Sequence, residues 1–211
     1  ESRRYAESAI EYEKTAYDYP RHEKSIEAGY AALFTYRKLY ESQTTNELKK
    51  TTNQKLISSL LKYSDRFPYD NRLPQIILTT TENYYSLGAF KDAIQTTQLL
   101  VQDRTIDPDI QHKAWVILAH SNYEIKDYRG AEYAYQESLL NARLTTSQRK
   151  ELVSQLGSSI YRQGEQARSE GQHLKAAGHF ERIGSLVPGF PLLMNADYDA
   201  EIYEAHHKHK V

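Results

Sequence analysis

The fold follows from the stretch WVILAHSNYEIKDYRGAEYAY, which runs from Trp115 to Tyr135. Apolar and small residues recur in it every three or four positions, as on one face of an α-helix. Lys126 and Asp127 interrupt this pattern, so the stretch predicts two helices joined by a short turn. One such pair cannot bury its apolar face alone, and similar pairs are therefore expected to stack on it.

The same arrangement recurs along the chain. The turn at 88–90 precedes the turn at 126–128 by 38 residues, and Leu156 follows Leu118 by another 38. Beyond that point the match resumes at Ala176 only after about seven extra residues, which is roughly two helical turns. The helix predicted at about 147–170 is therefore expected to be longer than its neighbours.

Gly, Pro and capping residues divide the whole chain into ten predicted helices with short connections. Asp107 and Pro108 supply an N-cap followed by proline at the first helical position. Gly88 marks the end of a helix, and Thr44 and Glu47 have the spacing of a capping box at the start of another. No segment alternates apolar and polar residues as a half-buried strand would.

The pattern resembles the tetratricopeptide repeat. Its positions match Trp115, Leu118 and Ala119 in the first helix, Tyr128 in the turn and Tyr135 in the second helix. The resemblance is strong over 71–188 and weaker outside, and a unit nearer 38 than the usual 34 residues departs from the family's common length. It implies an all-α fold, a right-handed α-solenoid of stacked antiparallel helix pairs with about ten helices.

The expected organisation is a single solenoid over residues 1–211. It comprises a half repeat at 2–20, repeats at about 23–68, 71–105, 109–143 and 147–188, and a half repeat at 192–207. Because both ends are half repeats with apolar faces, the chain is interpreted as a section of a longer array. Self-association through the terminal repeats is one possibility that this interpretation leaves open.

The resemblance also implies a binding groove, because the first helices of such pairs line a concave surface that holds a peptide or a helix. The groove positions carried over to this sequence are Tyr36, Gln75, Leu78, Glu82, Tyr85, Lys113, Val116, His120, Tyr123, Glu151, Ser154, Ser158 and Tyr161. The four tyrosines among them either form a ladder along the groove or pack against the next repeat. Both readings stay open from the sequence.

Composition excludes several other classes of protein. With 27 Lys and Arg against 28 Asp and Glu, the chain lacks the basic excess of a general nucleic-acid or anionic-membrane binder. No stretch approaches the roughly 20 apolar residues that span a bilayer. The absence of Cys excludes disulfides, zinc ribbons and thiol catalysis, and it favours a periplasmic over a cytoplasmic location.

No catalytic constellation, cofactor motif or Gly-rich phosphate loop is found. A cluster of His206, His207 and His209 at the C-terminus is a metal candidate, but no supporting partners can be named for it, so no metal site is predicted. The expected function is a non-catalytic scaffold that binds a partner protein or peptide, within a bacterial envelope assembly or export machine. The alternatives are a superstructure that positions a catalytic domain elsewhere on a longer chain, and a self-assembling array.

Overall fold

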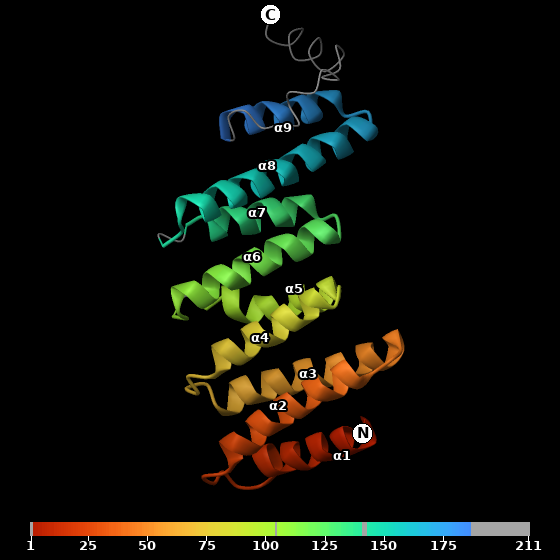
Figure 1. The fold of residues 1–211 in the computed structure, drawn as a ribbon, viewed down its shortest axis with the longest axis vertical. Helices are drawn as coiled ribbons and strands as arrows, with labels where there is room; N and C mark the ends of the chain where they lie inside the picture. Colours follow the sequence, from red (N-terminus) through yellow and green to blue (C-terminus); the bar gives the residue numbers. More distant parts are fainter. Residues whose placement is uncertain (1, 104, 141–142, 187–211) are drawn as a thin grey trace, which may run out of the picture. The chain divides into compact units, whose positions relative to one another are not determined.

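The computed structural model describes residues 2–103, 105–140 and 143–186 (Figure 1). Within these ranges the chain is all-α, with nine α-helices and no strand, which confirms the predicted fold class. The tenth predicted helix, at about 192–207, lies outside the described residues.

Short connections separate the helices. Their bounds are α1 Ser2–Glu13, α2 Ser25–Ser42, α3 Asn46–Arg66, α4 Leu73–Ser86, α5 Phe90–Val101, α6 Pro108–Glu124, α7 Tyr128–Ser138, α8 Thr146–Ser169 and α9 His173–Leu186. A π-helical turn, η1 (Lys14–Asp18), continues α1 before Pro20 ends the run.

The chain divides into two compact units, the first formed by residues 1–80 and the second beginning at Thr81 within α4. In the first unit α2 packs against both α1 and α3. In the second unit each helix from α5 to α9 packs against the next one. Within each unit successive helices run in opposite directions, so each is a stack of antiparallel helices (Figure 1).

Three of the turns share one backbone conformation. Gly88, Lys126 and Gly171 have φ angles of 70°, 66° and 73°, in the left-handed region. At each turn the N–H of the following residue donates to a carbonyl five positions earlier, at 2.8 or 2.9 Å, which ends the preceding helix in a Schellman motif. The left-handed residues at 88 and 126 are 38 positions apart, so the repeat also appears in the backbone conformation. The next interval, from 126 to 171, is 45 positions, which is 38 plus the seven extra residues.

Of the two helix starts for which the sequence predicts a named cap, one is confirmed and the other is wrong. The Asp107 side chain accepts hydrogen bonds from the backbone of the first turn of α6, and Pro108 follows it. The cap of α3 is Thr45, not Thr44, because Thr45 Oγ1 accepts the backbone N–H of Leu48 at 3.3 Å. Leu48 occupies the third helical position, so the predicted capping box with Glu47 was wrong.

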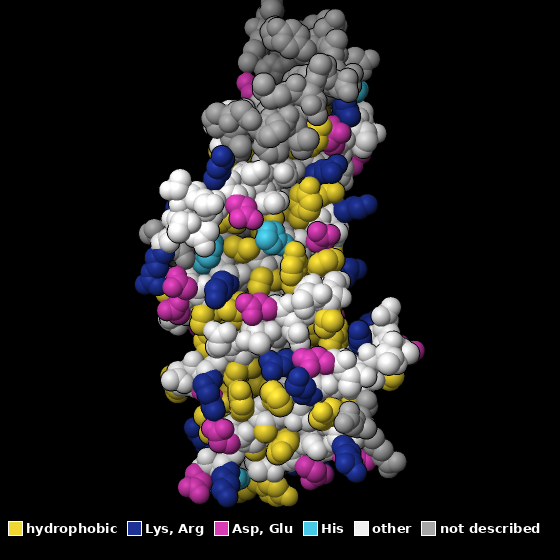
Figure 2. All heavy atoms as spheres, in the orientation of Figure 1, with side chains coloured by type: hydrophobic (Ala, Val, Ile, Leu, Met, Phe, Trp, Pro, Cys, Tyr) yellow, Lys and Arg dark blue, Asp and Glu magenta, His cyan; other side chains and the backbone are white. Residues whose placement is uncertain are grey.

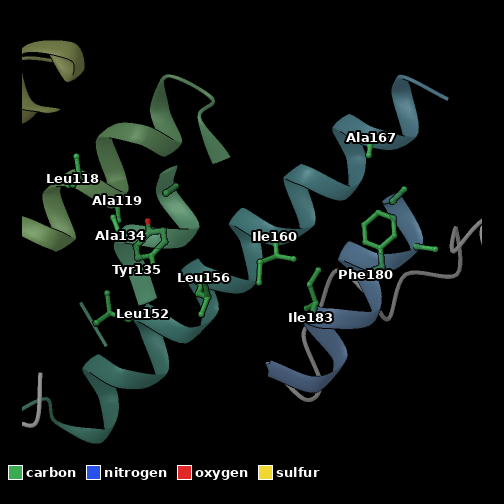
Figure 3. Close-up of a cluster of buried hydrophobic side chains, with 13 residues drawn as sticks. Leu118, Ala119, Ala134, Tyr135, Leu152, Leu156, Ile160, Ala167, Phe180 and Ile183 are labelled. Atoms are coloured by element: carbon green, nitrogen blue, oxygen red, sulfur yellow. The ribbon is translucent and has the colours of Figure 1, made fainter. Parts of the chain in front are cut away.

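A cluster of buried hydrophobic side chains joins α6, α7, α8 and α9 in the second unit (Figure 3). Tyr135 of α7, Ile160 of α8 and Ile183 of α9 are almost fully buried in it. Ala119 and Ala131, both fully buried, let the backbones of α6 and α7 approach closely. At 24 residues α8 is longer than α7 or α9, as the extra residues predicted.

Candidate functional site

A cleft of about 420 Å³ lies between α2 and the start of α4, entirely within the first unit. Both helices are the first members of their predicted pairs. The lining combines aromatic rings, guanidinium groups and uncharged polar side chains, contributed by Tyr30, Leu33, Phe34, Arg37, Asn71, Arg72, Gln75, Ile76, Thr79 and Thr80.

Two aromatic side chains of α2 reach solvent at the cleft. Tyr30 is 37% exposed and Phe34 is 45% exposed. They lie four residues apart, one above the other on the same face of the helix. Figure 2 shows hydrophobic side chains next to Lys and Arg side chains over α2. Leu33 is buried beside them, so the wall of the cleft is continuous with the core of the unit.

A guanidinium group covers each of these rings. The Arg37 guanidinium lies 5.3 Å from the centroid of Phe34, and that of Arg72 lies 4.9 Å from the centroid of Tyr30. Such contacts hold the charged group and the ring in a fixed relation. The cleft therefore presents apolar and cationic surface side by side.

Two carboxylates hold the Arg72 guanidinium in place. It forms ion pairs at 3.0 Å with Asp70, which is buried, and with Glu27. The Tyr63 hydroxyl, also buried, donates to Asp70. Burial raises the pKa of Asp70, but hydrogen bonds from Arg72 and Tyr63 outweigh it and leave this pKa below its usual value. Burial and the Asp70 carboxylate raise the pKa of Tyr63.

Arg37 forms fewer polar contacts than Arg72. Its Nε lies 4.0 Å from Glu41 Oε1, at the limit of an ion pair, and this buried nitrogen has no hydrogen-bond partner within the described part of the chain. Glu41 is also bound by Lys38 at 2.8 Å. The two Nη groups of Arg37 make no hydrogen bond or ion pair with the described residues, so Arg37 is the cation at the cleft with hydrogen-bonding capacity left for another molecule.

The groove positions inferred from the sequence are distributed differently from the expectation. Gln75 is exposed and lines the cleft. Tyr36 and Leu78 are buried, with 3% and 0% exposure, so they pack in the core and face no groove. Tyr36 lies on the stripe of α2 that faces the core, and its hydroxyl donates to Glu13 at 3.3 Å.

The other inferred groove positions belong to the second unit. Glu82, Lys113, Glu151 and Ser154 are exposed, whereas the partly buried ones are Tyr85, Val116, His120, Tyr123, Ser158 and Tyr161. Each of these three tyrosines packs against an aromatic ring of a second helix, with centroids 5.3 to 5.6 Å apart, namely Phe90, Tyr128 and Phe180. Packing therefore accounts for much of their surface.

His120 extends one of these aromatic contacts. Its ring lies 6.0 Å from that of Tyr85 and 5.6 Å from that of Tyr135. Burial lowers the pKa of His120, although Glu151 and Glu124 act in the opposite direction. Burial therefore favours the neutral form of this imidazole, which lies within an aromatic cluster.

The residues that the sequence interpretation missed are Tyr30, Phe34, Arg37 and Arg72. A signal for the first three exists, because they recur at spacings of four and three and form a second stripe on α2. Arg72 follows Asp70 in the connection to α4 and has no such signal.

The described residues offer neither a metal site nor a membrane span. Over the described ranges, no group of three or more His, Cys, Asp or Glu side chains is placed to hold a metal ion, and His206, His207 and His209 lie outside those ranges. Likewise, none of the helices that the structure describes is both long and apolar enough to cross a bilayer.

No protein-family model matches the chain, and no curated protein matches it.

Proposed function

We propose that this protein is a docking module that holds a segment of a partner polypeptide in the cleft between α2 and α4. The observation that carries the proposal is the pair of exposed rings, Tyr30 and Phe34, set beside Arg37. Aromatic and Arg side chains are the types most enriched among residues that dominate protein interfaces.

The apolar part of the cleft suits one side chain of the partner. A bulky aliphatic or aromatic residue placed against Tyr30 and Phe34 would remove their exposed surface from water. The rings sit on a regular helix above buried Leu33, so little ordering is needed before binding. This favours a short segment with at least one large apolar residue.

The charged part suits a carboxylate. Arg72 is already paired with Asp70 and Glu27, whereas Arg37 has only a distant contact with Glu41. An Asp or Glu of the partner can pair with the Arg37 guanidinium at the edge of the cleft. The proposed occupant is therefore a polypeptide segment in which an acidic residue lies near a large apolar one.

Selection from a displayed peptide library tests this proposal. Peptides enriched on the wild-type protein should share a large apolar residue near Asp or Glu, and Phe34→Ala should weaken their binding by about tenfold or more. Tyr69→Ala is the matched control, because Tyr69 is 98% exposed and does not line the cleft. No enrichment, or equal binding to the Phe34→Ala protein, would count against a docking cleft.

The same proposal places the helix pairs in the tetratricopeptide-like class. It is supported by left-handed residues at Gly88 and Lys126, 38 positions apart, and by the buried small residues Ala119 and Ala131 between α6 and α7. Proteins built in this way present the first helices of their pairs to partners, and in this proposal α2 and α4 are those helices.

A further inference from the structure

A second hollow, of about 650 Å³, lies in the second unit between α7 and α9. The C-terminal part of α8 and its C-cap Glu170 form one side of it, through Gln163, Gln166 and Glu170. These residues lie around the seven extra positions that lengthen α8. The extension thus adds lining that the shorter helix pairs lack, and it is polar.

A buried carboxylate forms part of this lining. Glu132 is 7% exposed and accepts hydrogen bonds from Gln163 at 2.7 Å and from Gln136 at 3.4 Å. Arg182 of α9 also donates to it and forms an ion pair with it. Arg182 balances the charge of Glu132, and the two glutamine amides satisfy its remaining hydrogen-bond acceptors. This carboxylate therefore forms part of a fixed polar network and needs no cationic ligand.

The cations around the hollow are less well compensated. The structure records no ion pair for Lys126, Arg129 or Lys175 with any described carboxylate. The remaining carboxylates are occupied locally, since Asp127 accepts the backbone N–H of Gly130 and Glu170 accepts from two glutamine side chains. Lys175 donates a hydrogen bond to Gln172 Oε1 at 3.2 Å but forms no ion pair with a described residue. With Arg182, the lining has four cations against the three carboxylates Asp127, Glu132 and Glu170, so positive charge is left for an anion.

Other groups favour a ligand with hydroxyls. Gln136 and Gln166 carry amides at the lining, and Tyr133, which is 56% exposed in total, also lines the hollow. Amides pair with hydroxyl groups, and an aromatic ring can cover the less polar face of a sugar ring.

We infer that the hollow between α7 and α9 binds a small hydroxylated acid, with its anionic group among Lys126, Arg129 and Lys175 and its hydroxyls against the amides of α7 and α8. A sugar carboxylate and a sugar phosphate share this chemistry. The site is separate from the cleft between α2 and α4 and does not depend on the proposed docking function.

Calorimetric titration of the whole chain distinguishes a sugar carboxylate from a sugar phosphate as the ligand. The probes are D-glucuronate, glucose 6-phosphate, D-glucose and inorganic phosphate. Saturable binding of either sugar acid, at least about tenfold tighter than that of glucose or inorganic phosphate, is the expected result. The stronger of the two shows whether a carboxylate or a phosphate is preferred.

Two variants locate the binding. Arg129→Gln removes an exposed cation and should weaken binding of the preferred sugar acid about tenfold, whereas Lys150→Gln, an exposed cation outside the hollow, should leave it unchanged. Thermal melting of both variants checks that the fold is intact. Absence of saturable binding by both sugar acids, equally tight inorganic phosphate, or binding unaffected by Arg129→Gln would overturn the inference.

Discussion

Phe180 of α9 packs so closely on Gly164 of α8 that a Cβ added to Gly164 would come within 2.5 Å of Phe180 Cε1. Phe180 belongs to the buried cluster drawn in Figure 3, so the contact joins the extended part of α8 to that cluster. Phe180 is 4% exposed and has no room to retreat without opening the core. We expect Gly164→Ala to lower the free energy of unfolding by about 1–3 kcal/mol, despite the higher helix propensity of Ala.

Gly178→Ala is the matched control for this change. Gly178 lies in α9, and none of the described atoms that could clash comes within 4 Å of its added Cβ. Here helix propensity acts alone, so stability should rise by about 0.5–1 kcal/mol. Urea unfolding of the two variants measures both effects, and equal stabilisation by the two changes would contradict the close contact.

Lys126 adopts the left-handed conformation that Gly88 and Gly171 adopt at the corresponding turns. Its Cβ makes this conformation unfavourable, at a cost of about 1 kcal/mol that glycine avoids. Lys126→Gly should therefore raise the midpoint of thermal unfolding, whereas Lys126→Ala should not. If the two variants melt at the same temperature, the turn does not have the described geometry.

The Tyr63–Asp70–Arg72 network predicts a large loss on truncation. Asp70→Ala leaves the buried Tyr63 hydroxyl without its acceptor and removes the ion pair of Arg72. The expected loss of unfolding free energy is about 3–5 kcal/mol, as for other broken buried pairs. Glu27→Ala, which removes the exposed partner of Arg72, should cost about 1 kcal/mol or less in the same denaturant series.

His120 predicts a pH dependence of stability. Because burial lowers its pKa in the folded state below the usual 6.5, the unfolded chain binds a proton more readily. Its contribution is complete above pH 6.5 and is lost as the pH falls toward the folded-state pKa. Unfolding free energies measured from pH 7.5 to 5 should decrease, and His120→Phe should decrease less steeply. A parallel decline in both proteins would show that other groups, such as His179, cause it.

The helices could be predicted from the sequence because their ends depend on local chemistry. Gly88, Asp107 and Pro108 act within a few residues of themselves, and the observed helices begin and end close to the expected positions. The extension of α8 followed from the spacing of Leu156 and Ala176 alone. Such features need no knowledge of tertiary packing.

The cleft could not be predicted in the same way. Tyr30, Phe34 and Tyr36 are all large and all lie on α2, and only the packing of α1 and α3 decides which of them is buried. The inferred groove included Tyr36 and Leu78, both of which are in the core. Arg37 acquires its role from the distance to Glu41 and the ring of Phe34, neither of which a spacing pattern encodes.

Amide chemical-shift mapping tests the docking cleft most directly. An acidic–apolar peptide selected on the wild-type protein is titrated into isotope-labelled protein, and the shifted amides are assigned. We expect the shifts to concentrate around Tyr30, Phe34, Arg37 and Gln75, and we expect Arg37→Gln to reduce affinity while Lys150→Gln does not. Shifts confined to the helices from α5 to α9, or affinity that is indifferent to Arg37→Gln, would contradict the proposed docking cleft.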